Sequence, residues 1–248
     1  NGIRSAAGKG LFDWFKRQRA DVLCLQETRA EREQLVDAHY FPRGWHVHYH
    51  VARSKRGYSG VAIYARREPD AVFDTLGWAP FDEEGRYLEL RFGQLSVVSL
   101  YLPSGSSSEE RQAFKYRVLE WLTPKLAEWR ASGREYVLCG DWNIAHRPID
   151  LRNWRANQKN SGFLPGERAW LDHAFEKLGW VDAYRALKPE AAEYTWWSNR
   201  GQAWANDVGW RIDYHVVTPG LREALRKTSI YRGQRFSDHA PLTVDYAL

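Results

Sequence analysis

Near the start of the chain, hydrophobic and polar residues follow two different patterns. Between residues 10 and 19, the spacing of Leu11, Trp14 and Phe15 places three large apolar side chains on one helical face. The next run, residues 21–27, is almost continuously apolar up to its acidic end, which is typical of a strand buried on both faces. The pattern therefore predicts a short amphipathic helix followed by a buried strand.

Further along, the same reasoning predicts both hairpins and helices. Residues 87–92 and 95–100 resemble two strands joined by a tight two-residue turn at Gly93-Gln94. The longest predicted helix covers about 108–131, and Pro124 is expected to kink or split it. This mixture favours a layered α/β or α+β fold over a TIM barrel. Shorter strands are expected at 60–64, 136–141, 214–217 and 242–246, with another helix at 166–178.

Composition narrows the class of protein. The 248 residues are 44% hydrophobic, enough for one full core, although this length also allows two small domains. No stretch approaches eighteen uninterrupted apolar residues, so we expect no membrane span. Two cysteines cannot form a disulfide scaffold, and both lie inside apolar strands, where we expect them to be buried. The net charge of +5 fits a polyanion-binding protein, but many soluble enzymes have such a charge.

The start of the chain is unusual. It contains no methionine and opens on Asn1-Gly2-Ile3-Arg4. We therefore expect a short N-terminal segment, a strand, to be missing ahead of Asn1.

Acidic residues stand at the ends of predicted strands. Glu27 and Asp141 each end an apolar run, and Asp238-His239 precedes the last one. A lone strand-end carboxylate is usually a cap or a solvated edge, but three of them favour a shared site, because ligands gather at strand ends in layered α/β folds. Oxygen donors suit a hard cation such as Mg²⁺.

Two further groupings add candidate chemistry. In Asp141-Trp142-Asn143, an extended backbone would place the carboxylate and the amide on one face, where they could hold a water molecule. An Asx turn after the strand explains the same tripeptide equally well. Asp213 lies two residues before His215, and Asp238 directly precedes His239; a neighbouring carboxylate can fix the tautomer of a histidine and raise its basicity.

Seven motifs in order give these residues a context. They are Asn1-Gly2-Ile3-Arg4, Leu25-Gln26-Glu27-Thr28, Tyr58-Ser59-Gly60-Val61-Ala62, Tyr101-Leu102-Pro103-Ser104-Gly105, Gly140-Asp141-Trp142-Asn143, Gly209-Trp210-Arg211-Ile212-Asp213-Tyr214 and Ser237-Asp238-His239-Ala240-Pro241. Together they span nearly the whole chain, and with them the chain resembles the exonuclease III family of apurinic/apyrimidinic (AP) endonucleases, within the endonuclease/exonuclease/phosphatase superfamily. The departure is at the start, where the family has a strand with another asparagine before Asn1.

The resemblance implies a single domain over residues 1–248 and a four-layer α/β sandwich, with two mixed β-sheets packed face to face and helices on the outside. It also implies hydrolysis of DNA phosphodiesters with Mg²⁺, or with Mn²⁺ in its place. The residues that match metal ligands are Asn1, Glu27, Asp141, Asn143 and Asp238. Those that match catalytic groups are Tyr101, Asp141, Asn143, Asp213 and His239. Those that match DNA or lesion contacts are Arg4, Arg56, Tyr58, Asn160, Trp196, Trp210 and Ile212.

Within this family the individual roles are also implied. Asp141 deprotonates or orients the attacking water, Asn143 steadies it, and His239 contacts the phosphate with Asp213 as its carboxylate partner. Whether Tyr101 or Asp141 is the general base stays open. Trp196, Trp210 and Ile212 line an apolar pocket for a flipped-out sugar without a base, although paired aromatics are more often simply core.

The resulting hypothesis is a DNA-repair phosphodiesterase that incises 5′ to abasic sites, processes 3′ ends, or does both. Its partner is double-stranded DNA, and basic stretches at 53–56 and 147–159 fit phosphate contacts. We expect a monomer in the cytoplasm, associated with the nucleoid if bacterial. Alternatives are a 3′–5′ exonuclease or 3′-phosphatase without abasic-site incision, an enzyme for a non-DNA phosphodiester, and a non-catalytic DNA-binding module.

Overall fold

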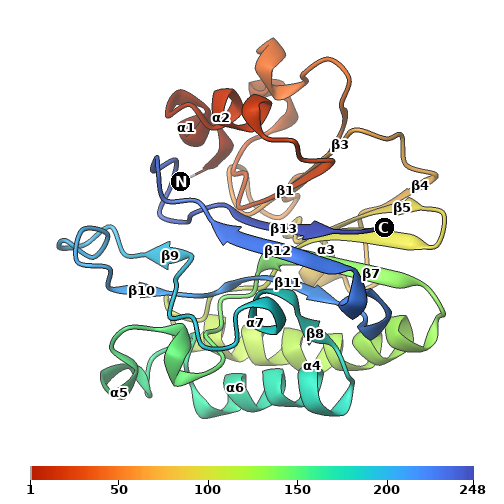
Figure 1. The fold of residues 1–248 in the computed structure, drawn as a ribbon. Helices are drawn as coiled ribbons and strands as arrows, with labels where there is room; N and C mark the ends of the chain where they lie inside the picture. The colour runs from red at the N-terminus through yellow and green to blue at the C-terminus, as the bar shows by residue number, and fades with distance from the viewer. Residues whose placement is uncertain (1) are drawn as a thin grey trace. The chain divides into compact units, whose positions relative to one another are not determined.

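The computed structural model describes residues 2–248, and Asn1 lies outside the described residues. Figure 1 shows the fold of the chain, which divides into two compact units. Of the described residues, the first unit contains 2–101 and 235–237, and the second contains 102–234 and 238–248. The single-domain prediction stays a prediction. Among residues 2–248, no helix combines the length and apolarity that crossing a membrane requires.

In the first unit, α1 (Gly2–Gly8) and α2 (Leu11–Arg17) precede a three-stranded antiparallel sheet. The prediction of α2 is confirmed, because it buries its apolar face, including Trp14. The sheet has the order β1 (Val22–Gln26), β3 (Val61–Ala65), β2 (His46–His50). The central β3 is fully buried, whereas β1 is only partly buried, so the expectation that β1 is buried on both faces was wrong. Its place at the edge of this sheet explains the difference.

The first unit also contains an antiparallel meander of β4 (Ala71–Phe73), β5 (Tyr87–Phe92) and β6 (Leu95–Tyr101). The predicted turn at Gly93-Gln94 joins β5 to β6, and Gly93 adopts a positive φ of 54° that glycine tolerates without strain. The predicted hairpin is therefore confirmed. The short helical segments of this unit are η1 (Arg32–Gln34), η2 (Ala38–Tyr40) and α3 (Ala79–Asp82).

The second unit is built on β7 (Glu135–Asp141), which pairs with β11 (Asp213–Val217). On its other side, β11 pairs with β8 (Val181–Asp182). All these pairs are antiparallel, and the predicted strands at 136–141 and 214–217 are confirmed. Two further antiparallel pairs are β9 (Trp196–Trp197) with β10 (Gly209–Trp210), and β12 (Leu225–Ile230) with β13 (Leu242–Tyr246).

Helices pack beside these strands. The long helix α4 (Glu109–Ala131) begins at Ser108, whose side chain accepts a hydrogen bond from the amide of Arg111. Pro124 does not split this helix, because it lies on the exposed side, where water can satisfy the backbone carbonyl that loses its partner. The alternative expectation, a kink at Pro124, stays a prediction. Figure 1 shows α6 (Pro165–Asp172) beside α4, and the indole of Trp170 donates to the hydroxyl of Thr123.

The helix predicted at 166–178 is present, but it changes character along its length. After α6 it continues as the π-helical turn η4 (His173–Lys177). The remaining short segments are η3 (Pro148–Asp150), α5 (Trp154–Asn157), α7 (Ala183–Leu187) and η5 (Pro219–Ala224). Cys139 is buried, as predicted, whereas Cys24 in the edge strand β1 is only partly buried, so the expectation for Cys24 was wrong. Several sheets with packed helices confirm the predicted α/β class.

Candidate active site

Three elements of the second unit bring a histidine and two carboxylates together. Asp141 ends β7 and lies opposite Asp213, the first residue of β11, in the strand register. His239 reaches the same place from the segment before β13, where it forms an isolated β-bridge with Trp196. The predicted catalytic residues from three distant stretches of sequence therefore lie side by side.

The imidazole of His239 lies between the two acids. Its Nδ1 is 2.9 Å from one carboxylate oxygen of Asp213, and its Nε2 is 3.9 Å from an oxygen of Asp141. Burial lowers the pKa of His239, but the charges of Asp213, Asp141 and Asp238 and the hydrogen bond to Asp213 raise it to about 10. The histidine side chain keeps 23% of its surface exposed, so a protonated imidazolium can meet an anionic ligand.

Asn143 joins this cluster through a turn. Its backbone φ is 52°, its amide N–H donates to Asp141 at 2.8 Å, and its side-chain Nδ2 donates to the same carboxylate at 3.2 Å. The expected extended backbone was wrong, since the Asx-turn alternative describes these contacts. Trp142 turns away, as predicted, and is fully buried. The turn still places the carboxylate and the amide together.

A buried ion pair supports this turn, and sequence analysis missed it. Lys115 of α4 donates to the backbone carbonyl of Asn143 at 2.7 Å and lies 2.6 Å from Glu167 of α6. Both side chains are fully buried. Burial lowers the pKa of Lys115, although the charges of Glu167 and Asp141 act against this effect. Glu167 also accepts the amides of Gly162 and Leu164, so the pair fixes the turn and the loop beside it.

An aromatic cluster lies close to the polar groups. Trp196 and Trp210 meet edge to face with ring centroids 6.3 Å apart, and both pack against a buried cluster that includes Ile212 and Phe163. The indole N–H of Trp196 donates to the carboxylate of Asp238 at 3.2 Å. The structure thus brings together all three residues predicted to contact a lesion, and it connects them to a predicted metal ligand.

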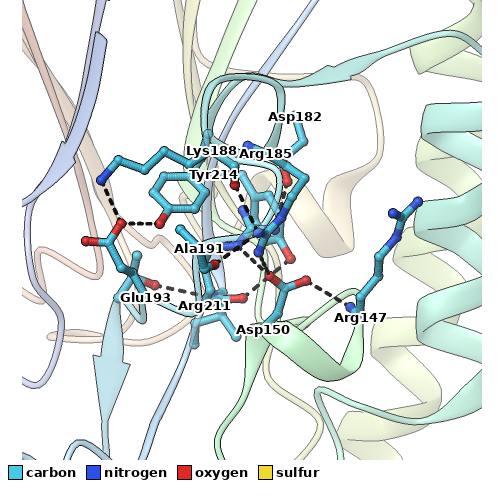
Figure 2. A network of polar contacts seen from close by, with 12 residues as sticks. Arg147, Asp150, Asp182, Arg185, Lys188, Ala191, Glu193, Arg211 and Tyr214 are labelled. Carbon is cyan, nitrogen blue, oxygen red and sulfur yellow. Dashed lines mark hydrogen bonds and ion pairs between the residues drawn. The ribbon is translucent and has the colours of Figure 1, made fainter.

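The residue between Trp210 and Ile212 points into a different environment (Figure 2). The guanidinium of Arg211 is fully buried and binds Asp150 at 2.7 Å and Asp182 at 2.8 Å. Arg185 binds the same Asp150 oxygen at 2.5 Å. Burial raises the pKa of Asp150, but Arg211 and Arg185 outweigh it and lower the pKa to about 2. This network anchors the backbone that carries the aromatic cluster.

The basic stretch at 147–159 is largely exposed, and in its middle the guanidinium of Arg155 lies 4.7 Å from the ring centre of Trp154. Asn160 follows it and donates to the side chain of Asn157 at 2.7 Å. The role of this stretch and of Asn160 in contacting DNA stays a prediction.

The other predicted site residues lie in the first unit. Glu27 follows β1 with a positive φ of 56° and forms an ion pair with Arg29. The rings of Tyr58 and Tyr101 both lie near the guanidinium of Arg86, which donates to the hydroxyl of Tyr58 at 3.2 Å. Two arginines predicted to contact DNA are exposed, namely Arg4 and Arg56.

The carboxylates of the second unit suit a divalent cation, whereas a protonated imidazolium has no lone pair to offer one. Among residues 2–248, Asp141, Asp213 and His239 form a cluster in which one ligand atom from each lies within 4.8 Å of the others. Because Asp213 already engages His239, the carboxylate of Asp141 is the better suited to a hard cation. Sequence analysis had assigned Asp213 and His239 to catalysis alone.

Comparison with known proteins agrees with the family resemblance of the sequence motifs. The family model described as "Endonuclease/Exonuclease/phosphatase family" matches residues 2–239. An exodeoxyribonuclease of Bacillus subtilis is 37% identical over 98% of this chain and 94% of its own length. A DNA-(apurinic or apyrimidinic site) endonuclease of Dictyostelium discoideum is 33% identical over 98% of this chain and 67% of its own length.

Solved structures extend the likeness to the fold. The AP endonuclease from Archaeoglobus fulgidus superposes with a TM-score of 0.89 at 29% identity, covering 100% of this chain and 96% of its own. The 3′ phosphatase NExo from Neisseria, bound to product DNA hairpin, gives 0.89 at 25% identity with the same coverage. The predicted fold class and the resemblance are confirmed. The chain therefore belongs to the endonuclease/exonuclease/phosphatase family, as a hydrolase of the exodeoxyribonuclease III and AP endonuclease type.

Proposed function

We propose that this chain is a Mg²⁺-dependent DNA-repair phosphodiesterase that incises DNA 5′ to abasic sites and processes 3′ ends. The observation that carries the proposal is the contact between a polar cluster and an apolar one. Asp141 and His239 lie together, and Trp196 joins the aromatic cluster to Asp238, the residue before His239. Such an arrangement can hold a phosphate and a baseless sugar at the same time.

Hydrolysis of a phosphodiester requires an in-line water and neutralisation of the non-bridging oxygens. Asp141 is suited to accept the proton of that water or to orient it, and Asn143 adds a hydrogen-bond donor beside it. The raised pKa of His239 keeps its imidazole protonated at neutral pH, so it can neutralise a phosphate oxygen. Asp213 holds the ring in place through Nδ1.

A bound Mg²⁺ would supply further charge neutralisation at the phosphate. In the second unit the carboxylates of Asp141 and Asp238 are the proposed ligands. The ligand roles of Asn1, Glu27 and Asn143 and the catalytic role of Tyr101 rest on the family resemblance alone, and they stay proposals.

Selection of the lesion follows from size. A nucleotide without a base costs less to unstack, and a tight apolar pocket lined by Trp196, Trp210 and Ile212 would admit its sugar while excluding a full nucleotide. Exposed basic residues at 53–56 and 147–159, together with Arg4, Tyr58 and Asn160, are proposed to contact the DNA backbone.

A second candidate is an enzyme with the same phosphate-ester chemistry but without a pocket for the lesion. The 3′ phosphatase NExo from Neisseria superposes as well as the archaeal AP endonuclease does. A 3′-phosphatase or 3′–5′ exonuclease without abasic-site incision is therefore the alternative. Either enzyme is proposed to act as a cytoplasmic monomer on double-stranded DNA.

The deciding experiment uses three labelled duplexes, carrying an internal abasic-site analogue, a recessed 3′ end, or a 3′ phosphate. Each is incubated with Mg²⁺, with Mn²⁺ and with EDTA. Incision at the analogue that EDTA abolishes supports the AP endonuclease, whereas reaction only at the 3′ ends supports the alternative. If the chain cuts none of the three in Mg²⁺ or Mn²⁺, the proposed function is wrong.

A further inference from the structure

Thr195 connects three segments of the second unit that meet at the candidate active site. It is fully buried and directly precedes β9. Its backbone N–H donates to the carbonyl of Trp210 at 2.9 Å, and its own carbonyl accepts the N–H of Ala240 at 2.7 Å. Thr195 therefore lies between the aromatic cluster and the residue that follows His239.

The side chain of Thr195 makes a second set of contacts. Its hydroxyl oxygen accepts the backbone N–H of Ile212 and the backbone N–H of Asp213, each at 3.1 Å. These two amides lie where the chain leaves β10 and enters β11. The hydroxyl therefore satisfies both amides of this junction and fixes the backbone between the two strands.

Thr195 thus helps to fix both Asp213 and His239. Asp213 receives the hydroxyl contact at its own amide, and its carboxylate engages His239. His239 is bonded to Ala240, whose amide is held by the carbonyl of Thr195. A small displacement at Thr195 would therefore shift the carboxylate and the imidazole relative to each other.

We propose that Thr195 is a positioning residue whose hydroxyl sets Asp213, and through it His239, for phosphodiester hydrolysis. This inference rests on the proposed function, because it concerns the same site. Valine has nearly the shape of threonine but lacks the acceptor, so in T195V the buried amides of Ile212 and Asp213 would lose this partner. A residue needed only for packing would tolerate that exchange, whereas a positioning hydroxyl would not.

The test compares T195V with T195S, which keeps the hydroxyl. On the abasic-analogue duplex we expect T195V to lower kcat by about 10- to 100-fold, the range that misplaced catalytic groups produce, with KM changed less than about threefold. T195S should recover most of the lost kcat. The matched control is T228V, since Thr228 is a buried threonine of β12 whose hydroxyl donates to the carbonyl of Thr243. It should leave kcat and KM unchanged.

A double-mutant cycle identifies the route. In a D213A background, T195V should cause little further loss of kcat, because the group through which Thr195 acts is gone. Losses that multiply would overturn the inference, as would a raised KM with unchanged kcat or a T195S as impaired as T195V. If near-UV circular dichroism shows that T195V does not fold, T195C replaces it, because a thiol is a weaker acceptor of similar size.

A readout independent of catalysis separates this inference from the proposed function. By NMR, the amides of Ile212 and Asp213 should exchange with solvent faster in T195V than in wild type and in T195S. Unchanged exchange would overturn the inference even in an active enzyme. Should the wild type cut none of the duplexes while exchange rises in T195V, the proposed function fails, the positioning of Asp213 stands, and its link to hydrolysis is overturned.

Discussion

Two clusters of charge in the second unit are built from neighbouring residues and behave differently. Arg211 enters a buried network in which Asp150 is held by two guanidiniums. Two positions later, Asp213 enters the cluster with His239 and Asp141. Asp150 is 1% exposed, whereas the imidazole of His239 is 23% exposed.

The difference lies in the partners of the carboxylates. A guanidinium stays charged at any ordinary pH and has a rigid fork, so the ion pairs of the Asp150 network stay formed and fixed in geometry. An imidazole can exchange its proton, and its partial exposure lets a ligand reach it. Buried charge alone therefore does not identify a functional site; a titratable partner that a ligand can reach does.

The largest effect should come from D141N. It removes the negative charge beside His239 and the proposed proton acceptor, while the amide keeps nearly the same shape. We expect kcat on an abasic-analogue duplex to fall by about 10²- to 10⁴-fold, the range for general acid–base groups. Single-turnover kinetics in Mg²⁺ would measure it. Turnover near that of wild type would remove Asp141 from the mechanism.

D150N should instead lower the stability of the protein much more than its kcat. It leaves Arg211 and Arg185 without their shared carboxylate in a buried site, so the free energy of unfolding should fall by about 3–5 kcal/mol. Urea denaturation measures the loss, and kcat of the folded fraction should change far less than in D141N. The matched control is D172N, whose carboxylate is 51% exposed beside His146 and should contribute less than about 1 kcal/mol. Equal losses in both variants would contradict the contrast.

Sequence patterns predicted the more apolar strands, such as β7 and β11, and most of the catalytic cluster, because apolar runs and terminal acids are local features. They missed other strands, including β2 and β12, which are rich in polar residues. The end of β7 at Asp141 and the position of His239 follow from such patterns together with motif order. The supporting contacts do not. Lys115 and Glu167 lie on different helices and look like solvated surface charges in the sequence, and only their packing at 2.6 Å reveals a buried pair.

The same limit applies to the Asp150 network and to the turn at Asn143. Arg211 sits inside a motif, but nothing local indicates that its partners are Asp150 and Asp182, which are 61 and 29 residues away. The left-handed backbone of Asn143 breaks the alternation that the strand would otherwise continue. Long-range pairing and turn conformation are therefore what the sequence left open.

A pH series should sharpen the contrast, because the two clusters titrate in opposite windows. The pKa of Asp150 is about 2, below its usual 3.8, so its contribution to stability is present above pH 3.8 and is lost as the pH falls through 2. The pKa of His239 is about 10, above its usual 6.5, so its contribution is present below pH 6.5 and is lost as the pH rises through 10.

Unfolding free energies of the wild type, D150N and H239Q would measure both windows. The gap between wild type and D150N should shrink by about 2 kcal/mol between pH 4 and pH 2. The gap between wild type and H239Q should shrink between pH 7 and pH 10 instead. Gaps that do not vary with pH would mean that neither shifted pKa is linked to folding.

The smallest expected effect concerns Trp210, which precedes Arg211 but faces the aromatic cluster. W210A leaves the ion network and the Asp213–His239 pair in place, and it opens the proposed pocket for the baseless sugar. We expect abasic-site incision to fall about tenfold more than removal of a 3′ phosphate, which corresponds to about 1.4 kcal/mol of selective transition-state binding.

The two reactions are measured on the same preparation, because a general loss of structure would lower both equally. W154A is the matched control, since Trp154 packs on the edge of the same cluster within the exposed basic stretch and is not a proposed pocket residue. It should lower the two activities by similar factors. Equal losses in W210A would instead assign Trp210 to the hydrophobic core, and the Asp150 network beside it would then support a packing surface rather than a specificity pocket.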